Sequence, residues 1–133
     1  MGTDGALLLI WAVCVVGGSA LLHEFGHAWT ARAVGWKVVG LRCRWYGVAF
    51  LADPSGKPEK VWKVALGGLA TTAVLALAFL AGMTLPDPAP ILFGLGFSVN
   101  AVLLFTNLVP IRAFDGGQIL AGLRSERLRR ESR

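Results

Sequence analysis

Residues 6–27 read ALLLIWAVCVVGGSALLHEFGH, an apolar run that passes directly into a cluster of ionisable side chains. The apolar part would form a helix about 25 Å long, close to the thickness of the hydrocarbon core of a bilayer. The helical pattern continues to Ala33, which predicts a first membrane-spanning helix over about 6–33. Ionisable residues are costly inside a membrane and usually have a function there. This stretch therefore indicates both the fold class and the place to look for a site.

The composition of the whole chain also indicates a membrane protein. Of its 133 residues, 55% are hydrophobic and 16% are charged, whereas soluble domains contain about 25% charged residues. So few polar side chains cannot cover the surface of a small soluble globule. We therefore exclude a soluble enzyme, a disordered tail and a disulfide scaffold, and we expect one domain over residues 1–133 in contact with the lipid bilayer.

Two further apolar runs predict two more membrane-spanning helices, over about 61–85 and 91–111. Each would be at least about 30 Å long as a helix. A proline-rich turn at 86–90 separates them. The two cysteines lie far apart in this arrangement, Cys14 in the first apolar run and Cys43 in a basic loop, so we expect free thiols.

The net charge of +5 follows membrane topology rather than nucleic-acid binding. All 13 Lys and Arg residues lie in two segments, 32–63 and 112–133. Basic residues gather on the cytoplasmic side of membrane proteins. We therefore expect a multi-pass cell-membrane protein with its N-terminus outside and its C-terminus in the cytoplasm. No nucleic-acid motif accompanies the charge, so we expect no nucleic-acid partner.

Alternation of apolar and polar residues predicts a β-hairpin at the membrane surface, over about 37–52. The apolar positions of its first strand recur at every second residue, and they are Val39, Leu41, Cys43 and Trp45. A second short run ends at Asp53-Pro54-Ser55-Gly56, a strong turn signal. Trp36, Trp45 and Trp62 are typical of the aromatic belt at a membrane interface.

After Gly117 the leucines and arginines occupy mostly different faces of a predicted helix over about 117–130. Such a helix lies in the membrane interface, where anionic headgroups attract its basic residues. The predicted fold is therefore an all-α membrane protein with three transmembrane helices. A small interfacial β-hairpin follows the first of them, and a short interfacial helix ends the chain.

The ionisable cluster in the first span is His23-Glu24-Phe25-Gly26-His27. A spacing of four residues places both imidazoles on one face of a helix, where they can bind one metal ion. Glu24 can then take a proton from a water molecule held beside them. These are the only two histidines in the chain. The alternative is a pair of interfacial histidines beside a glutamate that reaches the aqueous interface, because this motif also occurs by chance.

Catalytic zinc normally has three protein ligands, so a third ligand must come from elsewhere in the chain. Asp115 is the only carboxylate between Asp87 and Glu126, and it follows the third span at the membrane depth expected for the histidines. Two histidines and one carboxylate form a zinc site of the hydrolytic type, so we predict one zinc ion per chain. The alternative for Asp115 is an N-cap of the helix that follows it.

Together these motifs resemble those of the site-2 protease family of intramembrane zinc metalloproteases. The family signatures are His-Glu-x-x-His on one span and Asn-x-x-Pro…Asp-Gly on a later one. The first stands here at residues 23–27, and the second at Asn107, Pro110, Asp115 and Gly116. Without the resemblance, Asn107 would be interpreted as an interhelical hydrogen-bonding residue and Pro110 as a helix stop.

The resemblance implies a role for each matching residue. His23, His27 and Asp115 would bind zinc, and Glu24 would activate the attacking water. Asn107 would stabilise the substrate carbonyl or the developing oxyanion, which requires a fixed hydrogen-bond donor.

The chain departs from the family pattern at two places. Arg112-Ala113-Phe114 precedes the aspartate, where the family often has a proline-rich segment. Gly67-Gly68-Leu69-Ala70-Thr71 stands where many members have a Gly-Pro-Leu-Ala-Asn-like stretch. Since the Pro and Asn are missing, we assign these small residues to close helix packing rather than to substrate contact.

The expected function is hydrolysis of a peptide bond in or near a transmembrane segment of a membrane-protein substrate. The substrate helix must unwind before its carbonyls can react, and the 37–52 hairpin offers a strand edge for the unwound segment. One alternative is a non-catalytic zinc-binding scaffold or adaptor subunit, which has little need of Glu24. Prenyl-protein processing enzymes are a weaker alternative, because they use a glutamate as third ligand. The sequence leaves open whether the chain has a regulatory membrane partner or forms a homo-oligomer.

Overall fold

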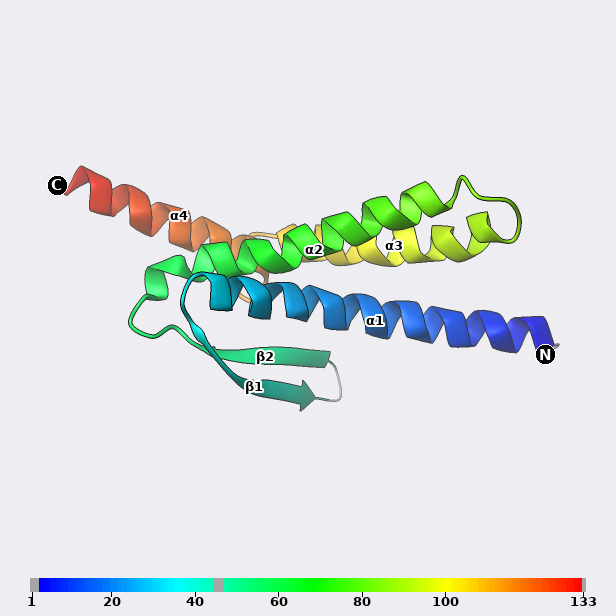
Figure 1. Ribbon diagram of the computed structural model, residues 1–133. Coiled ribbons are helices and arrows are strands. Elements are labelled where there is room, and N and C mark those ends of the chain that lie inside the picture. Colours follow the sequence, from blue (N-terminus) through cyan, green and yellow to red (C-terminus); the bar gives the residue numbers. More distant parts are fainter. Residues whose placement is uncertain (1–2, 45–46, 133) are drawn as a thin grey trace.

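The computed structural model describes residues 3–44 and 47–132. Three long helices lie side by side, a hairpin runs along the first of them, and a fourth helix extends from one end of the bundle (Figure 1). The elements are α1 (Thr3–Ala33), β1 (Lys37–Arg44), β2 (Gly47–Asp53), the 3-10 turn η1 (Pro58–Lys60), α2 (Val61–Gly82), α3 (Ala89–Leu108) and α4 (Asp115–Glu131). Helix α2 contacts each of the other three helices.

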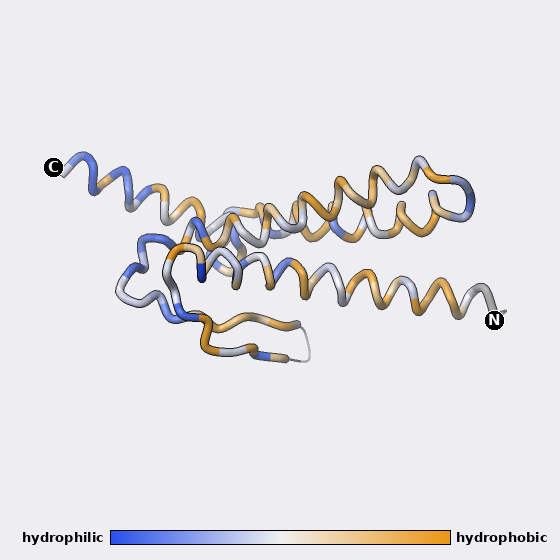
Figure 2. The backbone as a smooth tube through the Cα atoms, in the orientation of Figure 1, coloured by the Kyte–Doolittle hydropathy of each residue, from blue (hydrophilic) through white to orange (hydrophobic). Residues whose placement is uncertain are grey.

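Helices α1, α2 and α3 are each long and apolar enough to cross a membrane. Figure 2 shows hydrophobic residues along most of the bundle, whereas hydrophilic residues gather after β2 and in the second half of α4. Most large hydrophobic side chains point outward, among them Phe105, which is 71% exposed. The predicted multi-pass membrane protein with three spans is confirmed.

Proline sets the ends of the second and third spans, which differ by a few residues from their predicted bounds. Helix α3 ends at Leu108 rather than near residue 111, because Pro110 forces Val109 into an extended conformation with φ −58° and ψ 130°. Helix α2 ends at Gly82 rather than 85, and the chain then turns toward the prolines of residues 86–90. Helix α3 begins at Ala89, with Pro90 in its first turn, where proline is tolerated.

The interior of the bundle is built from small residues, so the helices approach closely. A Cβ atom at Gly26 of α1 would collide with Gly67 and Thr71 of α2, and one at Gly67 would collide with Thr30 and Gly26. The Gly67–Thr71 stretch therefore serves close helix packing, as predicted. Deeper in the bundle, Asn100 of α3 is fully buried and donates a hydrogen bond to Ser19 of α1 at 2.9 Å.

The chain leaves α1 through a tight turn that leads directly into the hairpin. Gly35 has φ 87°, a conformation that favours glycine, and the N–H of Trp36 donates to the carbonyl of Ala31 at 2.8 Å. A hairpin is confirmed here, with β1 and β2 antiparallel and a bulge at Val39, whereas its position at the membrane surface stays a prediction. Its strands run back alongside α1 (Figure 1). The predicted position of Trp45 lies outside the described residues.

Two more predictions concern the cysteines and the last helix. Cys14 and Cys43 are both free thiols, as predicted. A C-terminal helix is confirmed as α4, which begins two residues earlier than expected, at Asp115; its position in the membrane interface stays a prediction. It packs on the first turns of α2 through Gly122 and Trp62. It then continues beyond the start of α2 instead of folding back across the ends of the spans (Figure 1).

Candidate metal centre

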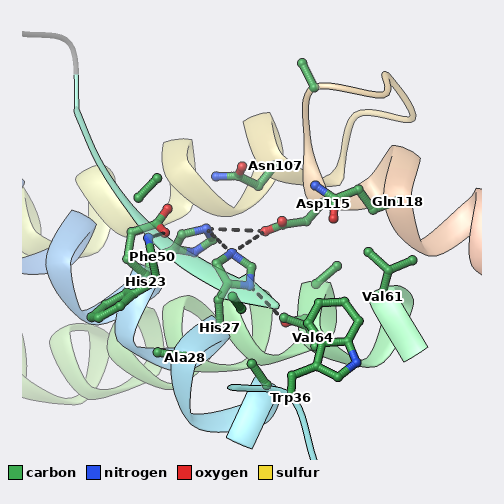
Figure 3. Close-up of a pocket in the computed structure, with 16 residues that line it drawn as sticks. His23, His27, Ala28, Trp36, Phe50, Val61, Val64, Asn107, Asp115 and Gln118 are labelled. Carbon is green, nitrogen blue, oxygen red and sulfur yellow. Dashed lines mark hydrogen bonds and ion pairs between the residues drawn. The ribbon is translucent and has the colours of Figure 1, made fainter. Parts of the chain in front are cut away.

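Three side chains from two distant parts of the chain meet at one point. His23 and His27 lie one turn apart on α1, and Asp115 is the first residue of α4. The Oδ2 atom of Asp115 lies 3.3 Å from Nε2 of each histidine, and the two Nε2 atoms lie 3.1 Å apart. The two imidazoles and the carboxylate point toward one another (Figure 3). His23 and Asp115 are each 6% exposed.

Asp115 does not cap the helix that it begins. The N-cap position of α4 is Phe114, and no side chain donates or accepts a capping hydrogen bond there. The carboxylate is directed to the histidines instead. The N-cap interpretation of Asp115 is therefore wrong, because the helix starts one position too early for it.

Hydrogen bonds from the other ring nitrogen determine the proton position on both imidazoles. Nδ1 of His27 lies 2.9 Å from the carbonyl oxygen of Val64, which can only accept, so Nδ1 carries the proton. Nδ1 of His23 lies 2.8 Å from Oγ1 of Thr72. The Thr72 hydroxyl proton is already donated to the carbonyl of Gly68 at 3.0 Å, so Thr72 accepts from His23. Both Nε2 atoms therefore present a lone pair to the centre.

Three hydrogen-bond acceptors thus converge on one point without a proton between them. The 3.1 Å contact between the Nε2 atoms joins two lone pairs, and Oδ2 of Asp115 is buried with no hydrogen-bond partner among the described residues. A cation at this point would provide a binding partner for all three acceptor atoms. Tetrahedral zinc with bonds of about 2.0–2.2 Å places its ligand atoms about 3.3 Å or slightly more apart. The observed separations and the donor set of two imidazoles and one carboxylate fit this ion.

The charge of Asp115 suits the same role. Burial opposes ionisation of the carboxyl group, but hydrogen bonds from His23 and His27 in their protonated form, together with the positive charge of that form, favour the carboxylate and outweigh burial. The pKa of Asp115 is therefore lowered from its ordinary value. At neutral pH Asp115 is a carboxylate, the form that could bind a metal ion.

The remaining predicted site residues line the same cavity as these three. It has a volume of about 370 Å³, and α1, the hairpin, α2, α3 and α4 or their flanking loops all contribute to its wall. Glu24 lies in this wall and accepts a hydrogen bond from the N–H of Phe50 at 3.2 Å. Asn107 also lies in the wall, and its Nδ2 donates to the carbonyl of Leu103 at 2.9 Å. An amide has two N–H donors, so one is left for another acceptor.

Comparison with known proteins places the chain among named relatives. No family model matches it. It is 33% identical over 126 residues to a protein of Synechocystis sp. named "putative zinc metalloprotease", a match that covers 92% of this chain and 33% of that protein. It is 29% identical over 135 residues to a protein of the same description from Methanocaldococcus jannaschii, covering 86% of this chain and 71% of that protein. The chain is therefore similar over most of its length to two proteins named as zinc metalloproteases.

This relationship agrees with the family resemblance that the paired motifs predict. The chain spans one third of the length of the Synechocystis relative and most of the length of the Methanocaldococcus one. The aligned region includes most of the chain in both cases.

Two residues of α2 that hold the metal centre were missed in the sequence. Thr72 fixes the proton position of His23, and a Cβ atom at Gly68 would collide with both imidazoles. Gly68 therefore does more than allow helix packing, because it makes room for the ligands. The only sequence signal is a threonine and a glycine four residues apart in an otherwise apolar span.

Proposed function

We propose that the chain is an intramembrane zinc metalloprotease of the site-2 protease type. It would hydrolyse a peptide bond in or near a transmembrane segment of a membrane-protein substrate. One observation carries the proposal: acceptor atoms of the buried His23 and Asp115 and of the partly buried His27 lie within 3.3 Å of one another and share a cavity with Glu24. The names of the two relatives and the three candidate spans support the same function.

His23, His27 and Asp115 would hold the ion. When bound, zinc polarises the scissile carbonyl and makes water more acidic. Glu24, next to the first ligand, would take a proton from the attacking water and deliver it to the leaving amine. Asn107 would donate its second N–H to the substrate carbonyl oxygen as negative charge develops there.

The hairpin supplies an edge for the unwound substrate beside this cavity. The N–H of Phe50 points to Glu24, so it does not pair with β1. Backbone groups alternate between the two edges of an antiparallel strand, so Val48 faces the same outer edge. An extended substrate segment added to this edge of β2 would lie against the metal centre.

We place the site near the cytoplasmic side of a cell membrane, with the N-terminus outside and the C-terminus in the cytoplasm. The support for this orientation is the distribution of basic residues. One group lies from the last turn of α1 to the first turn of α2, and the other lies after α3. The metal centre lies at this end of the bundle, where α1 ends and α4 begins. Water therefore has a short path to the scissile bond.

The test is zinc content per purified chain, followed by cleavage of a single-span model substrate containing helix-breaking residues. Wild type should bind about one zinc and cleave. Asp115→Asn should lose zinc, whereas Asp53→Asn, which removes a carboxylate on β2, should keep it. Glu24→Gln should retain zinc and lose cleavage. Zinc binding without cleavage of any such substrate would favour the scaffold alternative, and a folded wild type without zinc would contradict the proposal.

A further inference from the structure

A second hollow, of about 540 Å³, lies between the start of α2 and the second half of α4. Its lining residues are Trp62, Lys63, Glu126, Arg129 and Arg130. None of them lines the cavity of the metal centre. The hollow is therefore a separate feature, formed where α4 packs on α2.

The charges around this hollow are unbalanced. Three of its five lining residues are cations, and the single carboxylate, Glu126, accepts a hydrogen bond from Nε1 of Trp62 at 2.8 Å. Among the described residues, Lys63, Arg129 and Arg130 form no ion pair, and the ion pair within α4 joins Arg127 to Glu131 instead. Nζ of Lys63 lies 5.4 Å from the centre of the Trp62 ring. The hollow therefore attracts an anion.

The position of the hollow indicates the source of that anion. Trp62 and Lys63 lie in the first turn of α2, near the start of the candidate span Pro58–Gly82. The ends of spans lie at the depth of the lipid headgroups, where tryptophan is enriched. Lys and Arg clusters next to a span attract anionic lipids, and arginine binds phosphate oxygens in a paired geometry.

We propose that this hollow binds the phosphate group of an anionic phospholipid. Lys63 approaches from α2, and Arg129 and Arg130 approach from α4, so one headgroup would join the two helices. Helix α4 begins at Asp115, so the same headgroup would brace the helix that carries the third metal ligand. The proposal does not depend on proteolysis, because it concerns residues outside the metal centre.

The experiment is native mass spectrometry of the detergent-purified full chain, titrated with phosphatidylglycerol, with phosphatidylcholine or with inorganic phosphate. The test variant is Arg129→Gln with Arg130→Gln. The control variant is Arg124→Gln with Arg127→Gln, which removes the same number of positive charges from α4 outside the hollow. Lys63→Gln tests the contribution of α2. Zinc content and elution volume of each variant report that it is folded.

We expect one phosphatidylglycerol to bind in preference to phosphatidylcholine, whose choline cation the hollow would repel. Binding should become roughly fivefold weaker in Lys63→Gln and roughly thirtyfold weaker in the test variant, at about 1 kcal/mol for each cation removed, while the control variant should resemble wild type. If phosphatidylglycerol binding were weakened equally in both double variants, the lipid would be attracted by the overall charge of α4 and not by this hollow, which would overturn the proposal. Equal binding of the two lipids would also overturn it. Inorganic phosphate that binds as tightly as phosphatidylglycerol, and is lost in the same variants, would overturn the lipid as the source of the phosphate.

Discussion

The backbone N–H of Phe50 in β2 donates a hydrogen bond to Oε2 of Glu24 in α1, over 3.2 Å. This contact joins the proposed base to the strand edge on which we place the substrate. One N–H cannot serve both the Glu24 carboxylate and a substrate carbonyl. A substrate strand that pairs with Phe50 would therefore release Glu24 at the moment it is needed.

Removing this N–H tests the link between the strand edge and the base. We expect Phe50→Pro to lower kcat/KM roughly two- to tenfold, because the substrate strand loses a hydrogen bond that contributes about 0.5–1.5 kcal/mol. Proline is tolerated at an outer strand edge because no pairing to β1 is lost. Phe50→Ala, which keeps the N–H, is the control for the side chain. The idea fails if the two variants cleave the model substrate equally well.

Val48→Pro separates substrate pairing from positioning of Glu24. It removes another N–H from the outer edge of β2 and leaves the contact between Phe50 and Glu24 in place. We expect KM to rise and kcat to change little, because only binding of the extended substrate is weakened. The measurement is steady-state cleavage of the model substrate in detergent. An unchanged KM would argue against strand pairing at this edge.

Thr72 should control metal affinity without touching the metal. Thr72→Val keeps the shape of the side chain but removes the oxygen that accepts from Nδ1 of His23. Loss of such an outer partner typically weakens metal binding by about ten- to a hundredfold. Thr71→Val is the matched control, because its hydroxyl donates to the carbonyl of Gly67 and forms no hydrogen bond to the imidazoles. Competition with a zinc chelator measures both, and equal zinc affinity in the two variants would contradict the assignment.

Gly68 should be intolerant of a methyl group. A Cβ atom there would collide with the rings of His23 and His27, so we expect Gly68→Ala to displace the ligands and to lose most of the bound zinc. Gly18→Ala on α1 has open space around the new methyl group and should retain zinc. Helical alanine is favoured over glycine by roughly 0.5–1 kcal/mol. The measurement is the zinc content of the two variants, purified side by side. Equal zinc content in both would contradict this role of Gly68.

Acid should release zinc by protonating the imidazoles rather than the carboxylate. The pKa of Asp115 is lowered from its ordinary value. The side chain therefore stays ionised as the pH falls from neutral. It takes up a proton only below the pH range that is usual for aspartate. Neutral imidazole is required for metal binding, and its ordinary pKa is about 6.5. The dissociation constant for zinc, measured by chelator competition across a pH series, should therefore rise as the pH falls below about 6.5. A dissociation constant that stays level from neutrality down to the range of carboxyl groups would show that the histidines are not ligands.

Local patterns in the sequence determine a large part of this protein. Apolar runs long enough to cross a bilayer predict α1, α2 and α3, because backbone groups inside lipid must be satisfied within a helix. A four-residue spacing places His23 and His27 on one face of α1, and alternation predicts the two strands that follow. These features depend on neighbours within a few residues, so the chain shows them directly.

Tertiary structure alone decides how these parts meet. Asp115 stands next to the histidines because α4 packs on α2, and the direction of its carboxylate toward them rather than to a cap depends on where α4 begins. Thr72, Gly68 and the carbonyl of Val64 contact the imidazoles because α1 and α2 cross at small residues. Periodicity identifies which residues share a face of one helix. Which faces meet, and at what height, depends on packing between segments far apart in the chain.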